Sequence, residues 1–239
     1  MKAAAEFDQF ADTYDSDLNQ ALSVSGEDKD YFARGRVSFL VGCLRDLREA
    51  PQSAMDYGCG IGGTALLLRE LVGVGRVVGL DISERSLDRA RGESQGAAFR
   101  FQTFEQYEPA ANLNLAYCNG VFHHIPVEER RAAIAYIYRS LQPGGIFAFW
   151  ENNPWNPGAR YVMAKCVFDR NAIIVTSTQA KRMLLEAGFE IIRTDFLFYF
   201  PRVLKSLRFM EDGLRRLPLG AQYQVLCRRP LTQDRSALV

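Results

Sequence analysis

The glycine-rich segment that directly follows a short apolar run is the feature that most limits how this chain can fold. The segment reads DYGCGIGG from Asp56 to Gly63, between the strand candidate SAMDYG and the helix candidate TALLLREL. Glycines let a backbone turn sharply and let a ligand approach it closely. The start of a helix also offers unpaired N–H groups to a bound ligand. We therefore expect a strand-turn-helix unit with a ligand site at the turn.

Six further short apolar runs follow, and most of them are separated by helical patterns. They read RVVGLDIS, AAFRFQTF, LNLAYCNG, IFAFWE, EIIRTDFLFYF and AQYQVLCRR. Parallel strands need crossover helices between them, so this alternation predicts an α/β fold with an open, mostly parallel sheet and helices on both faces.

The chain is interpreted as one domain over residues 1–239, with three parts. Residues 1–50 form a helical cap in which Phe7, Phe10 and Tyr14 share one helix face, and a second helix runs from about residue 31 to 47. Residues 51–151 hold the core of the sheet. Residues 152–239 form the other half, with insertions at 152–175 and 201–217. The prolines and asparagines of the first insertion predict irregular structure up to a helix capped by Thr176 or Ser177 and ended by Gly188.

Composition excludes several classes of protein. The 29 basic and 28 acidic side chains give a net charge of +1, which argues against a non-specific nucleic-acid binder. The five cysteines are scattered and never spaced as CxxC, so we expect neither disulfides nor a zinc site, and no metal ligands elsewhere. The N-terminus lacks a secretory signal and no apolar run approaches a membrane span, so we expect a cytoplasmic protein.

The glycine loop fits two classes of cofactor. Gly58, Gly60 and Gly63 satisfy the dinucleotide pattern GxGxxG, whereas Gly58, Gly60 and Gly62 satisfy GxGxG after an acidic residue. Asp81, 25 residues after Asp56, can accept the ribose hydroxyls of either cofactor. The carboxylate of Asp56 would repel a phosphate but attract an ammonium group, which favours S-adenosylmethionine over a dinucleotide.

Further segments carry a family resemblance. MDYGCGIGGTA, VVGLDIS, CNGVFHHIP and SLQPGGIFAFWE resemble successive motifs of the small-molecule class I methyltransferases, and FDQFADTYD is similar to the N-terminal helix that closes over the cofactor in many of them. The resemblance covers roughly residues 6–230. It implies a Rossmann-like sheet of seven strands with the last strand antiparallel, and S-adenosylmethionine as the methyl donor, leaving S-adenosylhomocysteine as product.

The resemblance also implies roles for individual residues. The glycine loop and Asp56 would hold the methionine part of the cofactor, Asp81 its ribose, and Ile82 one face of its adenine. FQTFEQ lacks the acidic residue that many relatives use at the adenine edge, so that contact is left open. The residues implied in cofactor binding are Tyr14, Asp56, Gly58, Cys59, Gly60, Gly62, Asp81, Ile82, Thr103, Phe104, Asn119 and Gly120.

Methyl transfer to a hydroxyl needs a proton acceptor, whereas transfer to a carboxylate needs none. The only histidines, His123 and His124, follow the fourth strand, and either one is a candidate base, with His124 preferred. The alternative is that one of them only packs or caps the next helix. Glu151, at the end of the fifth strand, is a second candidate base and a candidate contact of the methyl acceptor.

Three segments should enclose the acceptor: the N-terminal helices, NNPWNPGARY, and FLFYFPRVLKSLRFM. Their aromatic side chains suit an apolar, aromatic or lipid- or sugar-type metabolite methylated on a hydroxyl or carboxyl oxygen, with Trp155, Tyr161 and Phe198 as candidate contacts. Residues 201–217 are an amphipathic stretch that would serve as a lid, a dimer surface or a membrane-surface helix. The chain is expected to be a monomer or homodimer. The segment NGVF stands where methyltransferases acting on base amines carry NPPY, which disfavours methylation of such an amine. The alternatives are a nicotinamide-dependent oxidoreductase or a cofactor-binding relative recruited to another reaction.

Overall fold

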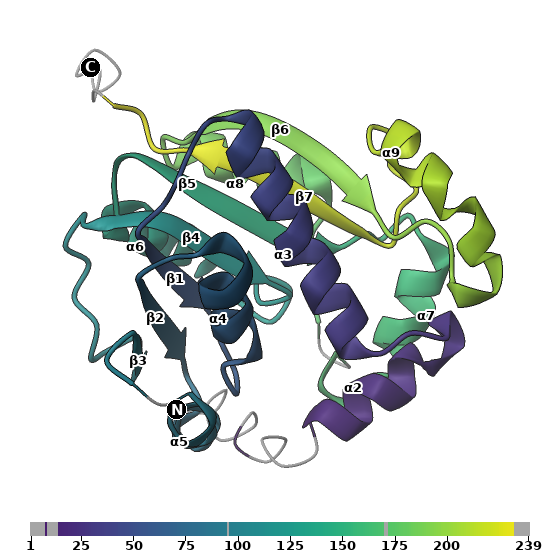
Figure 1. Ribbon diagram of the computed structural model, residues 1–239, viewed down its shortest axis with the longest axis horizontal. Helices are drawn as coiled ribbons and strands as arrows, with labels where there is room; N and C mark the ends of the chain where they lie inside the picture. The colour runs from purple at the N-terminus through teal and green to yellow at the C-terminus, as the bar shows by residue number, and fades with distance from the viewer. Residues whose placement is uncertain (1–7, 9–13, 95, 170–171, 232–239) are drawn as a thin grey trace.

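The computed structural model describes residues 8, 14–94, 96–169 and 172–231. Its centre is a seven-stranded sheet in the order β3-β2-β1-β4-β5-β7-β6 (Figure 1). Strands β1 to β5 pair in parallel, and β7 runs antiparallel to both β5 and β6. This confirms the predicted sheet, including the antiparallel last strand. The strands are β1 (Ser53–Tyr57), β2 (Arg76–Asp81), β3 (Phe99–Thr103), β4 (Leu113–Asn119), β5 (Leu141–Asn152), β6 (Glu190–Leu197) and β7 (Gln222–Arg228).

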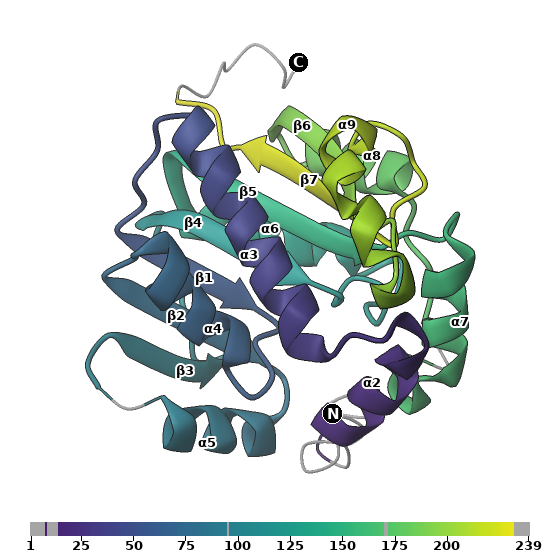
Figure 2. The same ribbon diagram turned by 45° about the vertical axis from the view of Figure 1, so that its right-hand side comes forward.

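Helices cover both faces of the sheet (Figures 1 and 2). One face packs against α3 (Lys29–Asp46), α4 (Gly63–Leu67) with its π-helical continuation η2 (Leu68–Val72), and α5 (Glu84–Glu93). The other face packs against α6 (Arg130–Ser140) and α8 (Ser177–Glu186). Side chains alternate between the two cores along each strand, so Ala54 and Met55 of β1 belong to opposite layers.

The order of the strands places a crevice at the carboxyl edge of the sheet. The chain builds β1, β2 and β3 outward in one direction and then returns to add β4 on the other side of β1. In open α/β sheets ligands bind at such a reversal, outside the carboxyl ends of the strands. Tyr57, Asp81 and Asn119 end β1, β2 and β4, and therefore flank this point.

Further elements surround the same edge. They are α2 (Tyr14–Leu22), η1 (Ser23–Ser25), α7 (Pro157–Lys165), η3 (Val167–Asp169), η4 (Arg202–Met210) and α9 (Glu211–Leu214). In Figure 2, α2 and α7 lie close together, and α9 lies over the ends of β6 and β7. Of the predicted N-terminal helix, only Asp8 and residues from Tyr14 onward fall among the described residues.

The structure corrects the expectation of irregular structure at 152–175. Helix α7 begins at Pro157, and the side chain of Asn156 accepts a hydrogen bond from the Ala159 amide. Asparagine at the N-cap followed by proline at the first helical position is a helix-start pattern, so the residues read as loop formers in fact start a helix. The amphipathic stretch 201–217, expected to form one helix or two short ones, forms the 3-10 helix η4 followed by the short α9.

The remaining helix signals were predicted correctly. Thr176 and Gln179 form a capping box at the start of α8, which decides between the two candidate caps. Gly188 follows α8 with a φ of 92°. No helix within the described ranges is long and apolar enough to cross a membrane.

Candidate functional site

Three glycines of the loop after β1 adopt positive φ, and their surroundings differ. Gly58, Gly60 and Gly62 have φ of 74°, 52° and 87°. A Cβ on Gly58 would lie 2.3 Å from Val121, and one on Gly62 would lie 3.0 Å from Ala90. A Cβ on Gly60 would meet nothing within 4 Å. Gly58 and Gly62 therefore allow close packing, and Gly60 leaves the open space that a ligand would occupy.

Asp56 brings a buried carboxylate to this loop. The side chain is 2% exposed, and its Oδ2 atom has no hydrogen-bond partner among the described residues. Burial, together with the charge of Asp81, raises its pKa to about 7, although the amide of Ala65 hydrogen-bonds to it. A buried carboxylate without a partner is costly, so the site suits a ligand that supplies a donor or a positive charge.

Asp81 ties the end of β2 to the glycine loop. Its carboxylate accepts hydrogen bonds from the amides of Gly60 at 2.8 Å and Ser83 at 2.9 Å. Burial raises its pKa, and the nearby carboxylate of Asp8 adds to the effect. The hydroxyl of Ser83 donates to Asp8 at 2.6 Å, so the N-terminal segment contacts the site at this point. The carboxylate still has capacity to accept a hydrogen bond from a ligand.

Other predicted cofactor residues surround the same loop. Asp81 and Thr103 are paired in register between β2 and β3, and the side chain of Ile82 is 38% exposed beside them. The ring of Phe104 packs on Tyr57 with centroids 4.6 Å apart. The thiol of Cys59 is buried beneath the loop, where burial raises its pKa. Tyr14 is the first residue of α2.

Asn119 and Gly120 complete the crevice at the end of β4. The Oδ1 atom of Asn119 is buried without a hydrogen-bond partner among the described residues. Gly120 has a φ of 66°, and its amide donates to the carbonyl of Trp150 at 3.1 Å. Asn119 and Asp56 thus bring two unsatisfied acceptors to neighbouring strands, on either side of the strand-order reversal.

His123 is buried and held between two carboxylates. Its Nδ1 atom lies 2.6 Å from Glu151 and its Nε2 atom 3.3 Å from Asp169. Burial by itself would lower the pKa of His123, but the two carboxylates raise it to about 10. Glu151 is 1% exposed and also accepts from the amides of Phe122 and His123. Glu151 therefore orients His123 and is closed off from the crevice.

The ring of His124 packs against that of His123, with centroids 4.1 Å apart and planes tilted by 54°. Its Nε2 atom also lies 3.3 Å from the same Oδ1 atom of Asp169, and 16% of its side chain is exposed. Burial alone would raise the pKa of Asp169, but hydrogen bonds from the two imidazoles lower it to about 2. Asp169 lies in η3, far along the chain, and nothing in its local sequence pointed to this contact.

A cavity of about 350 Å³ lies among the three segments expected to enclose an acceptor. Its wall includes Phe198 and Phe200 at the end of β6, together with Tyr31 and Phe32 of α3 and Val162 of α7. The guanidinium of Arg208 lies 4.7 Å from the Tyr31 ring centroid and 3.0 Å from Glu27. The sequence had pointed to Phe198 but missed the two α3 aromatics, which the helix pattern alone does not distinguish from core residues.

Two predicted acceptor contacts lie outside this cavity. Trp155 is 68% exposed and Tyr161 is 51% exposed, and neither lines the wall. Arg36 connects the cavity to the sheet because it donates to the hydroxyl of Tyr117 at 3.1 Å and to Gln222 at 2.8 Å. Gln222 is part of the wall.

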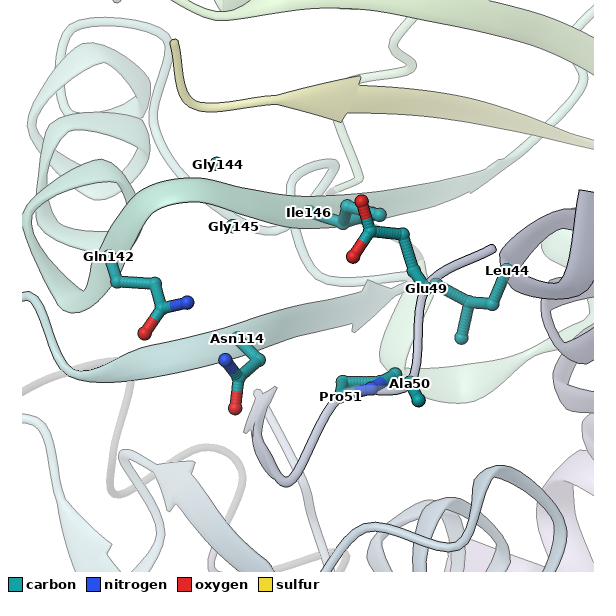
Figure 3. A pocket seen from close by; sticks show the side chains of 9 residues that line it. All are labelled: Leu44, Glu49, Ala50, Pro51, Asn114, Gln142, Gly144, Gly145 and Ile146. Carbon is teal, nitrogen blue, oxygen red and sulfur yellow. The ribbon is translucent and has the colours of Figure 1, made fainter. Parts of the chain in front are cut away.

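A second cavity, of about 50 Å³, lies at the opposite edge of the sheet. Its lining includes Pro51, just before β1, and Asn114, near the start of β4 (Figure 3). It is therefore separate from the glycine loop and too small for a nucleoside.

Comparison with known proteins gives a family for the central part of the chain. Residues 54–145 match the family described as "Methyltransferase domain". Trans-aconitate 2-methyltransferase of Methylobacterium radiotolerans is 31% identical over 100 residues, 42% of this chain and 38% of that protein. Sterol 24-C-methyltransferase of Pneumocystis carinii is 26% identical over 187 residues, 72% of this chain and 48% of that protein. The chain thus spans less than half the length of these relatives.

The fold is shared with solved structures of methyltransferases. Magnesium protoporphyrin IX methyltransferase from Synechocystis, solved with bound S-adenosylhomocysteine, superimposes with a TM-score of 0.58 at 19% identity, covering 88% of this chain and 86% of that one. Both comparisons point to methyltransferases, the class to which the GxGxG interpretation of the glycine pattern belongs.

Proposed function

We propose that this chain is a class I methyltransferase that transfers the methyl group of S-adenosylmethionine to a small-molecule acceptor, because residues 54–145 match a methyltransferase domain and the fold is shared with such an enzyme. The observation that carries the proposal is the open space at Gly60, together with one oxygen each of Asp56 and Asn119 that is buried without a hydrogen-bond partner among the described residues. Hydrogen-bond acceptors at this position suit the ammonium group of the cofactor, and the carboxylate would repel a pyrophosphate.

The residues present fit the rest of the cofactor. Asp81 would accept the ribose hydroxyls with its remaining lone pairs, and Ile82 offers an exposed apolar side chain to the adenine. Thr103, in register with Asp81, would lie at the adenine edge. Gly58 and Gly62 allow the positive φ values that keep the loop in this conformation.

The bound cofactor supplies a methyl group activated by a sulfonium leaving group. The protein's task is then to hold the acceptor oxygen in line with that methyl group and to exclude water. His123 is enclosed by Glu151 and Asp169, so the hypothesis of a histidine base narrows to His124, whose ring keeps an exposed edge. A carboxylate acceptor would need no base at all.

The proposed acceptor is an apolar, aromatic or lipid- or sugar-type metabolite that offers a hydroxyl or carboxyl oxygen. The cavity between α3, α7 and the end of β6 supports this class because aromatic rings form much of its wall. Glu27 and Arg208 add one paired charge of each sign, which would orient a polar end of the acceptor. The sterol methyltransferase among the relatives acts on an acceptor of apolar type.

Calorimetric titration with S-adenosylhomocysteine tests the proposal. We expect saturable binding by the parent protein and none of NAD⁺. Asp81→Asn should weaken binding by about 10- to 100-fold, because hydrogen bonds to a charged group contribute about 1.5–3 kcal/mol. Glu186→Gln, an exposed charge change on α8, is the matched control and should bind like the parent. Binding of NAD⁺, or an unchanged affinity in Asp81→Asn, would contradict the assignment.

A further inference from the structure

His123, His124 and Asp169 place three potential metal ligands around one point. The two imidazole Nε2 atoms each lie 3.3 Å from the Oδ1 atom of Asp169. A ligand atom from each of the three residues lies within 4.8 Å of the others. The three side chains are 3%, 16% and 8% exposed. Within the described part of the chain, no other group of histidine, cysteine and acidic side chains meets this geometry.

The two imidazole-to-carboxylate distances are long for hydrogen bonds and also suit two ligands of one ion. Charge-assisted N–H···O bonds are about 2.7–2.9 Å long, so 3.3 Å is long for either histidine. Two ligand atoms about 2.0–2.1 Å from a tetrahedral zinc ion are separated by about 3.3–3.4 Å. Both imidazole-to-carboxylate distances have this value, and one carboxylate oxygen serves both rings.

Glu151 supplies the support that metal-bound histidines usually have. It engages Nδ1 of His123 at 2.6 Å, which directs the Nε2 atom toward Asp169. Glu151 is itself fixed by the amides of Phe122 and His123. A carboxylate on the far nitrogen of a histidine sets its tautomer and ring orientation for a metal ion.

We propose that His123, His124 and Asp169 bind a divalent first-row transition ion of the Zn²⁺ type. Two imidazoles and one carboxylate suit such an ion, whereas Mg²⁺ and Ca²⁺ prefer oxygen ligands. The ion would take the place of the protons that the two Nε2 atoms share with Asp169. Three protein ligands leave at least one position for water or an oxygen of another molecule.

This site goes beyond the proposed methyl transfer and departs from the expectation of no metal ligands. It lies next to the crevice, since a Cβ on Gly120 would be 3.6 Å from Cε1 of His123. As a metal ligand, His124 would not act as a general base. Metal binding is measured without cofactor or acceptor, so its outcome is independent of the methyltransferase assignment.

The test is titration of chelator-treated protein with Zn²⁺, followed by calorimetry, and with Co²⁺, followed by its visible absorption. We expect one ion per chain and a Co²⁺ spectrum without thiolate charge-transfer bands. Asp169→Asn and His124→Asn should each weaken binding at least tenfold. Glu128→Gln removes an exposed carboxylate of the neighbouring loop and should bind like the parent.

Glu151→Gln keeps all three ligands and should weaken binding by about 10- to 100-fold. Circular dichroism of each variant would show whether its fold is retained, and the Co²⁺ spectrum of the parent protein needs no variant. Three results would overturn the proposal: no stoichiometric binding by the parent, thiolate bands in the Co²⁺ spectrum, or equal affinity in folded Asp169→Asn.

Discussion

Among single residues, Asp56 links the sequence most directly to the ligand. Burial and the neighbouring carboxylate of Asp81 raise the pKa of Asp56. The cofactor's ammonium group would bring the missing positive charge. The residue that disfavours a pyrophosphate thus makes the empty loop electrostatically unfavourable at neutral pH.

Asp56 predicts that cofactor affinity depends on pH. Its pKa is about 7 in the ligand-free protein, and a bound ammonium group would favour the ionised form. Affinity for S-adenosylhomocysteine should therefore rise by about tenfold between pH 5.5 and 7.5, as measured by calorimetry. Asp56→Asn cannot ionise, and any titration of the ligand itself cancels in the comparison. An equal pH dependence in this variant would refute the link.

The same shift predicts the pH dependence of stability. The pKa of Asp56 is higher in the folded protein than the 3.8 of an unperturbed carboxyl, so the folded state binds the proton more tightly. The stabilisation is complete below pH 3.8 and is lost as the pH rises through 7. The difference in melting temperature between ligand-free Asp56→Asn and the ligand-free parent should therefore be more favourable to the variant at pH 8 than at pH 5.5. A constant difference between the two proteins at all pH values would contradict this.

At the scale of elements, α8 shows a local signal that determines a helix end. The side chain of Thr176 accepts from the Gln179 amide at 3.2 Å, and Gln179 reaches back to the Thr176 amide at 2.9 Å. Thr176→Ala should lower the free energy of unfolding by about 1 kcal/mol, measured by urea denaturation. Ser177→Ala, inside the first turn, is the control and should cost less. The reverse order would show that Ser177 caps the helix in solution.

The strands and most helices could be predicted because their signals are local. Short apolar runs, caps and a glycine such as Gly188 act within a few residues of the chain. The contact of Asp169 with His123 and His124 could not be predicted, since it joins segments about 45 residues apart through the position of η3. The start of α7 was missed for another reason. Asparagine and proline are both common in loops, and only the order of Asn156 and Pro157 indicates the start of a helix.

At the scale of the whole molecule, the candidate acceptor cavity depends on elements from three parts of the chain. Phe198 at the end of β6 has a φ of 64° and packs edge-on against Phe32 of α3, with centroids 4.9 Å apart. Across the cavity, α7 contributes Val162. The cofactor loop belongs to β1, so binding of the two substrates is assigned to different elements and can be separated by mutation.

Val162→Trp is expected to impair binding of the methyl acceptor without changing binding of the cofactor. The larger side chain would fill part of the cavity of about 350 Å³, so methyl transfer to an aromatic acceptor should show a raised KM or be lost. Affinity for S-adenosylhomocysteine should stay within about twofold of the parent, because Asp56, Gly60 and Asp81 are untouched. Ala164→Trp adds the same bulk to an exposed position of α7 and should leave both properties unchanged. If Val162→Trp kept the parent's KM, the acceptor would have to bind outside this cavity.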